Sequence, residues 1–173
     1  MKLLGLFALI LITQLTIAQE TYKNDIYGFK ITFPEDYDVV EEDREKMDVI
    51  SLSSTNGNMV LLTSLFDYKE KIPSSELNWK EVEALGVTAD AFNSKFLPKK
   101  IKTWKVGDYE GKVNTIKGKV TSKAGNKMKF YGRMYVLCIK DGIEFRITIL
   151  ANSKKNFNEA IATAFVKSFK FFG

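Results

Sequence analysis

The 173-residue sequence contains no histidine, one cysteine and three prolines. Without histidine, Ser-His-Asp and Cys-His mechanisms, a histidine general base and histidine metal sites are excluded. A single cysteine likewise excludes intramolecular disulfides and cysteine-rich zinc sites. No glycine-rich phosphate loop of the GxGxxG or GxxxxGK[ST] type is present. The sequence therefore predicts neither a cofactor nor a metal ion for this protein.

Residues 1–18 have the pattern of a cleaved secretory signal. Lys2 gives a positive start, Leu3 to Ile12 is an uninterrupted apolar run, and Thr16-Ile17-Ala18 offers small residues for a signal peptidase. The apolar run is shorter than the about 20 residues of a membrane span. We therefore expect an exported protein, periplasmic or secreted, with one mature domain over residues 19–173 and no transmembrane segment after cleavage. An uncleaved anchor is the alternative.

Charge is unevenly spread along the chain. Residues 19–94 hold 7 basic and 16 acidic residues, a net charge of −9, whereas residues 95–173 hold 18 basic and 5 acidic residues, a net charge of +13. Either the two halves partly neutralise each other in one fold, or the molecule has a dipole and a basic surface. No linker separates the halves, so we expect a single domain with a polar surface.

Alternating apolar and polar residues predict a mainly antiparallel sheet. Residues 28–33 alternate and end at a proline, which is typical of a strand. Further short strands are expected at 39–40 and 48–53, and an Asn56-Gly57 turn is expected to lead into a strand over 59–66.

Three helices are expected. Two short ones run from Ser74 to Leu85 and from Thr88 to Phe96. The third is amphipathic, with Ser153 as its N-cap and apolar residues three and four positions apart, namely Phe157, Ala160, Ile161, Ala164 and Phe165. Residues 169–172 are expected to form a short closing strand.

Long hairpins are predicted between Lys112 and Ala151. An Asp141-Gly142 turn places Lys140 opposite Ile143 and, by continuation, Val136 opposite Ile147. A second, three-residue loop at 124–126 joins the first two strands. This register puts one apolar face beneath the C-terminal helix: Ile116, Val120, Phe130, Met134, Val136, Cys138, Phe145, Ile147 and Ile149. Cys138 is thereby predicted to be a small core residue.

The opposite face of these hairpins carries the candidate binding residues: Lys117, Lys119, Lys129, Tyr131, Arg133 and Tyr135. In the predicted register Lys117 lies opposite Arg133. Basic and aromatic residues interleaved on a sheet are typical of a platform for anions. Export argues against nucleic acid, so the expected partner is an envelope protein, an anionic glycan or a lipid head group. The alternative is a hydrated surface without function.

Two segments resemble a known family. Tyr27 to Pro34, with Tyr37, resembles the opening strand of PsbP-like domains, and residues 157–171 resemble their closing helix and strand. DcrB-type envelope proteins are similar at the same places. The resemblance implies an α+β fold, an α/β/α sandwich around a mainly antiparallel sheet, used as an accessory or assembly subunit without enzymatic activity. The metal binding of some photosynthetic members is not carried over, because this chain lacks histidine.

Two function hypotheses remain open. The first is an exported non-catalytic binding module, and the second is an exported hydrolase that uses carboxylates or lysine. The candidate acids for the second are Asp36, Asp38, Glu41 and Glu42, which also fit a solvated charged loop. They lack the Asp-x-Asp-x-Asp-Gly pattern of a calcium loop. Trp79 and Trp104 are candidates for stacking on a sugar or another flat ligand, or for simple packing.

Overall fold

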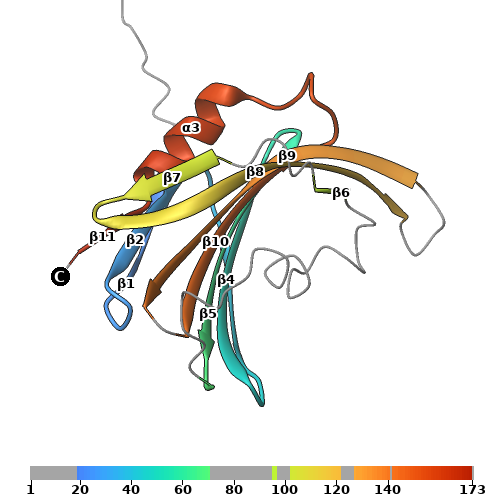
Figure 1. The fold of residues 1–173 in the computed structure, drawn as a ribbon. Helices are drawn as coiled ribbons and strands as arrows, with labels where there is room; N and C mark the ends of the chain where they lie inside the picture. The colour runs from blue at the N-terminus through green and yellow to red at the C-terminus, as the bar shows by residue number, and fades with distance from the viewer. Residues whose placement is uncertain (1–18, 71–94, 97–101, 122–126, 141, 173) are drawn as a thin grey trace, which may run out of the picture.

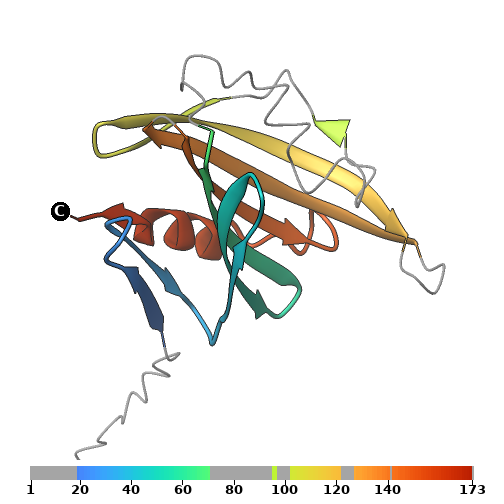
Figure 2. The same ribbon diagram turned by 90° about the horizontal axis from the view of Figure 1, so that it is seen from below.

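The computed structural model describes residues 19–70, 95–96, 102–121, 127–140 and 142–172, which form two antiparallel sheets and one helix (Figure 1). The small sheet has the order β1-β2-β11, with β1 at Glu20–Asn24, β2 at Phe29–Phe33 and β11 at Lys170–Phe171. The helix, α3, spans Glu159–Ser168. Figure 2 shows α3 and the small sheet on the same side of the large sheet.

The large sheet has the order β3-β4-β5-β10-β9-β8-β6, and β7 pairs with β8 beside β6. Its strands are β3 Asp38–Asp43, β4 Met47–Asn56, β5 Met59–Tyr68, β6 Lys95–Phe96, β7 Lys102–Val106, β8 Tyr109–Thr121, β9 Lys127–Lys140 and β10 Ile143–Ala151. The predicted strands at 28–33, 39–40, 48–53 and 59–66 are confirmed, whereas β1 was not predicted.

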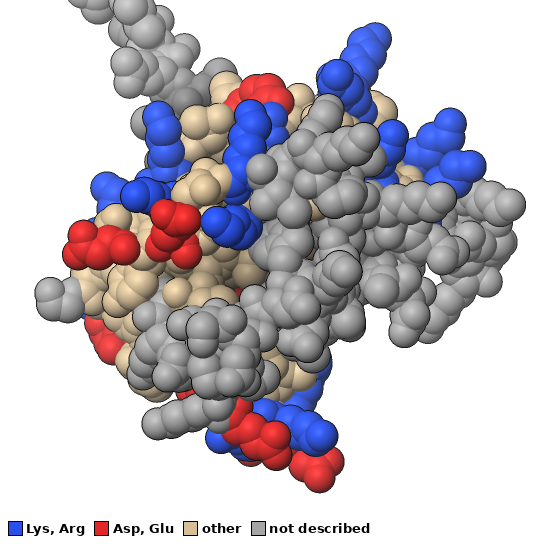
Figure 3. Space-filling view, in the orientation of Figure 1, with Lys and Arg blue, Asp and Glu red and all other residues tan. Residues whose placement is uncertain are grey.

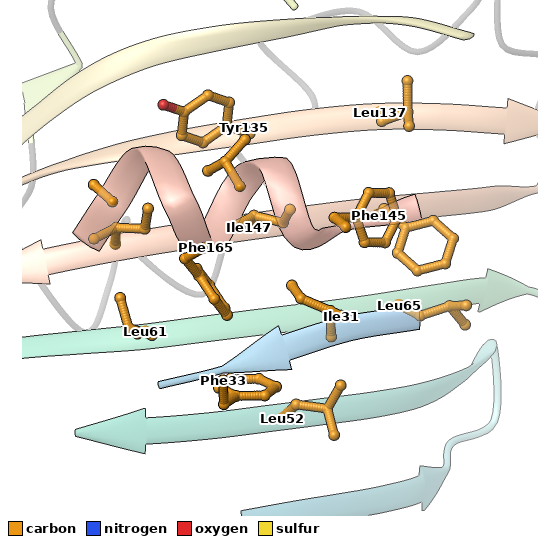
Figure 4. Close-up of a cluster of buried hydrophobic side chains, with 14 of the residues drawn as sticks. Ile31, Phe33, Leu52, Leu61, Leu65, Tyr135, Leu137, Phe145, Ile147 and Phe165 are labelled. Atoms are coloured by element: carbon orange, nitrogen blue, oxygen red, sulfur yellow. The ribbon is translucent and has the colours of Figure 1, made fainter. Parts of the chain in front are cut away.

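The main core lies between the large sheet and the layer made by α3 and the small sheet. Phe29, Ile31 and Phe33 of β2 are fully buried in it, as their alternation predicts. Figure 4 shows Phe33 and Phe165 pointing toward each other, with ring centroids 5.0 Å apart. These aromatic contacts join strand, helix and sheet, so the two resembling segments of the sequence are the ones that close the core.

The observed register of the β9–β10 hairpin differs from the predicted one by one residue. Ile143 lies opposite Lys140 as predicted, but a bulge follows and Glu144 lies opposite Cys138. Ile147 therefore pairs with Tyr135 and not with Val136. Residues 134–139 of β9 are apolar on both faces, so alternation could not choose between the two parities.

The face beneath α3 therefore differs from the predicted one. Tyr135 and Leu137 join Phe145, Ile147 and Ile149 in the main core. The predicted members Ile116, Met134 and Val136 form a separate cluster with Phe130 and Leu150, on the other face of the sheet. Cys138 shares that other face and is only partly buried.

The observed register of the β8–β9 hairpin differs from the predicted one by two residues. Lys117 lies opposite Tyr131 and not Arg133, and Lys119 lies opposite Lys129. β8 ends at Thr121 and β9 begins at Lys127, so the predicted three-residue loop is too short. A shift of two keeps together the side chains of β8 and β9 that were predicted to share a face, because the period of a strand is two.

The C-terminal helix is confirmed, but the predicted N-cap residue is wrong. Asn158, not Ser153, is the N-cap, and its Oδ1 accepts hydrogen bonds from the backbone N–H groups of Ala160 at 3.0 Å and Ile161 at 3.2 Å. The helix buries Ala162, Phe165 and Val166, whereas Ala160 and Ala164, both predicted on its apolar face, are exposed.

The predicted helices at 74–85 and 88–96 fall outside the described residues, except that Lys95–Phe96 is a strand paired with β8. The antiparallel sheets with one C-terminal helix are confirmed, and the second helical layer of a sandwich stays a prediction. The signal segment 1–18 also lies outside the described part. Within the described residues, no helix is both long and apolar enough to cross a membrane.

Candidate functional site

The six predicted binding residues share one face of the β8–β9 hairpin, but they divide into an inner and an outer group. Tyr135 is buried, and Tyr131 and Arg133 are partly buried. The other three, Lys117, Lys119 and Lys129, are exposed. The structure places this face on the side of the sheet that carries α3, and not on the opposite side as predicted. The C-terminal segment contacts the inner group there, whereas the outer lysines lie at or beyond the end of β10.

The inner tyrosines pack against other aromatic rings. Tyr135 is 9% exposed and makes an edge contact with Trp104 at a centroid distance of 5.2 Å. Tyr131 makes an edge contact with Phe157 at 5.3 Å. Trp104 also lies 6.3 Å from Phe169, so its ring is held by packing. These contacts join β7 and β9 to the C-terminal segment.

Arg133 connects the sheet to the start of α3. Its Nη2 lies 2.6 Å from Oε1 of Glu159, the first residue of the helix. Its guanidinium carbon also lies 5.2 Å from the ring centroid of Phe157. Burial opposes the charged form, but hydrogen bonds with Tyr135 and Glu159 outweigh it and raise the pKa of Arg133. Arg133 therefore carries a structural role in this face.

The outer lysines occupy the free end of the hairpin, and we call Lys117, Lys119 and Lys129 the lysine tip. β10 ends at Ala151 opposite Tyr131, so Lys129 has only β8 beside it. None of the three forms an ion pair with a described residue. Figure 3 shows blue side chains without red neighbours at this end of the hairpin, on the right.

The strand order also separates charge across the large sheet. β3, at one edge, carries Asp38, Glu41, Glu42 and Asp43 and no basic residue. β8 and β9, which lie toward the other edge, carry the lysine tip. β4, β5 and β10 lie between them. The uneven charge of the sequence is thus uneven across the sheet as well, which favours a molecule with a dipole.

A buried polar cluster on the face opposite α3 was missed by the sequence analysis. Glu144 is 0% and Arg146 5% exposed, and Arg146 Nε donates to Glu144 Oε1. The hydroxyl of Tyr68 donates to Glu144 Oε2 at 3.3 Å, and the Arg146 guanidinium lies over the Phe66 ring at 4.6 Å. The available signal was two opposite charges two positions apart in a strand whose other residues are apolar except Thr148.

This cluster keeps the Tyr68 hydroxyl and the Cys138 thiol protonated at neutral pH. Burial, with the nearby Glu144 carboxylate, raises the pKa of Tyr68 to about 12. Burial and the same carboxylate raise the pKa of the Cys138 thiol to about 12. A thiol in that state is a poor nucleophile, because the thiolate is the reactive form. The arrangement is a buried ion pair with a tyrosine as third member.

The four candidate acids do not meet in one site. Asp36 and Asp38 line an open groove of about 540 Å³ beside β4. Glu41 and Glu42 lie on β3, where Glu42 pairs with Arg44 at 2.5 Å. In the described part of the chain, no group of three or more acids, cysteines or histidines is placed to hold a metal ion.

Comparison with known proteins gives a structural match. No protein-family model and no curated protein matches the chain. Its structure is similar to the solution structure of cyanobacterial PsbP (CyanoP) from Synechocystis sp. PCC 6803, with a TM-score of 0.60 and 10% sequence identity over 90% of this chain and 94% of that one. At this identity the likeness establishes the fold alone. The chain has a PsbP-like fold, as the two resembling segments predicted.

Proposed function

We propose that this protein is an exported, non-catalytic accessory module of the cell envelope that binds an anionic partner through the lysine tip. The PsbP-like fold supports an accessory role. The charged start, apolar run and small residues of the first 18 positions support export. The basic end of the β8–β9 hairpin supplies the binding surface.

The observation that carries the proposal is the position of Lys119 directly opposite Lys129. Like charges opposite each other in an antiparallel pair are destabilising. No described carboxylate pairs with either ammonium group. A negatively charged partner at this end removes the repulsion and forms an ion pair with each lysine. The repulsion that destabilises the free protein therefore favours binding.

The structure supports the alternative, an exported hydrolase, less well than it supports a binding module. Such an enzyme needs two acids that flank one cleft. Glu35, Asp36 and Asp38 line one groove, but all three come from a single segment, and the facing residues described there are Ser53, Ser54 and Thr55 of β4. Tyr68 and Cys138 of the buried polar cluster are protonated at neutral pH and supply no nucleophile either. We therefore retain the binding module.

A retention experiment tests this function. The mature protein, immobilised and exposed to envelope extract, is expected to retain an acidic component. Added salt is expected to release it, because the range of interaction between exposed charges falls from about 8 Å at physiological ionic strength to about 3 Å at 1 M salt. The double variant Lys119→Glu/Lys129→Glu is expected to lose it. Lys154→Glu/Lys155→Glu is the matched control, since both lysines are exposed and lie outside the hairpin. Equal retention by all three proteins would contradict the proposal.

A further inference from the structure

A groove of about 740 Å³ lies between α3 and the small sheet, away from every residue of the lysine tip. Its volume is within the about 300–1,000 Å³ of small-molecule sites. The groove is lined along one side by α3 and along the other by β1 and β2. Thr21 and Thr32 also line it, and their hydroxyl oxygens lie 2.9 Å apart.

The two ends of this groove differ in chemistry. β11 places Lys170 opposite Lys30, and Ser168 Oγ accepts a hydrogen bond of 3.0 Å from the Thr32 backbone N–H. The end of α3 therefore lies beside β2, and the start of α3 lies beyond the end of that strand. Lys30, Lys167 and Lys170 gather at the first end, whereas the other end is lined by Pro34, Ala160 and Ile161.

The basic end has no described negative partner. Lys30 has lysines opposite it on both sides, Lys23 on β1 and Lys170 on β11. Lys23 pairs with Asp25 at 2.5 Å, but Lys30, Lys167 and Lys170 form no ion pair with a described residue. Among the described residues, none that lines the groove is acidic. Charge complementarity therefore calls for an anion at this end.

The wall of the groove along α3 leaves room for an alkyl chain. Ala160 and Ala164 are exposed on successive turns and face the groove, and Ile161 beside them is partly buried. Larger side chains at either alanine would fill the space. The groove thus combines three ammonium groups at one end with an aliphatic wall extending from it.

We propose that this groove binds a single-chain amphiphile with an anionic head group, carboxylate or phosphate. The head group lies between Lys30, Lys167 and Lys170, and the alkyl chain follows Ala164 and Ala160 toward Pro34. This site is separate from the lysine tip and does not depend on the partner proposed for it.

Titration of the mature protein with dodecanoate and with dodecyl phosphate tests the site, read by calorimetry and by NMR shifts of α3 and β2. Both probes are expected to bind, and the tighter one identifies the head group. Acetate, which lacks the chain, and dodecyl maltoside, which lacks the charge, are expected to bind at least tenfold more weakly. Equal binding of dodecyl maltoside, or no binding of either anionic probe, would overturn the proposal.

Variants locate the ligand. Ala164→Trp, which fills the groove, and Lys30→Gln/Lys170→Gln, which removes head-group charge, are each expected to weaken binding of the preferred probe at least tenfold. Thr163→Trp, exposed on the same helix but outside the groove, and Lys117→Gln/Lys129→Gln are the controls and are expected to bind normally. Tighter binding of hexaglutamate than of either amphiphile would assign the groove to acidic peptides and overturn the amphiphile.

Discussion

Arg133 on β9 and Glu159 at the start of α3 form an ion pair of 2.6 Å that joins the large sheet to the helix. Both partners carry a second favourable interaction. Arg133 lies over the Phe157 ring, and Glu159 is an acidic residue in the first turn, where the helix dipole favours negative charge. The arginine that the sequence offers as a ligand for anions is thus already paired within the protein.

A double-mutant cycle measures the coupling energy between Arg133 and Glu159. Arg133→Ala and Glu159→Ala are each expected to lower the free energy of unfolding, with a coupling energy of about 0.2–1 kcal/mol, because the pair is partly exposed. Urea denaturation gives the four values. A coupling energy of zero would mean that the contact does not hold α3 on the sheet.

The bulge in the β9–β10 hairpin makes Leu137 a core residue. Leu137 is 0% exposed, whereas the predicted register put it on the face opposite the helix. Leu137→Ala is expected to lower the free energy of unfolding by about 2–5 kcal/mol, as for other buried leucines. Thr148→Ala, partly buried on the other face, serves as the comparison. A decrease in the free energy of unfolding below about 0.5 kcal/mol for Leu137→Ala, measured by urea denaturation, would contradict the bulge and support the predicted register.

The thiol of Cys138 is expected to be unreactive in the folded protein. Its pKa is raised to about 12, so almost no thiolate is present at pH 8. A thiol reagent such as dithionitrobenzoate is expected to label it slowly, at a rate that rises when guanidinium unfolds the chain. Fast labelling of the folded protein would place Cys138 away from Glu144.

Alkaline pH is expected to destabilise the fold. Tyr68 and Cys138 both have pKa values of about 12 in the folded protein, above their ordinary values of 10.0 and 9.0. The unfolded chain therefore loses these protons first, and the free energy of unfolding falls as pH rises from about 9 toward 12. Cys138→Ser is expected to reduce the fall measured between pH 8 and 10. The same slope in wild type and variant would exclude the thiol as a cause.

The sequence was most informative where one face of an element is apolar and the other polar. The alternation of 28–33 correctly predicted which side of β2 is buried, and the helical spacing of Phe165 predicted its burial. It was least informative over 134–139, where both faces are apolar and a single bulge changes the parity.

The candidate site was predictable only in part. The sequence grouped the lysine tip correctly on one face of a hairpin, because a register error of two preserves faces. It did not reveal that Tyr135 and Arg133 have partners in β7 and α3, since Trp104 and Glu159 are distant in the chain. Nor did it reveal the groove beside α3, whose lysines come from β2, α3 and β11.

Photo-crosslinking in intact cells tests the central claim most directly. p-Benzoylphenylalanine in place of Lys119, or of Lys129, reports which molecules contact the lysine tip, and the same residue in place of Lys154 is the exposed control. The proposal predicts one discrete product common to positions 119 and 129, lost at high salt in envelope preparations and absent at position 154. No product at either hairpin position, or the same products at all three, would contradict a partner held by the lysine tip.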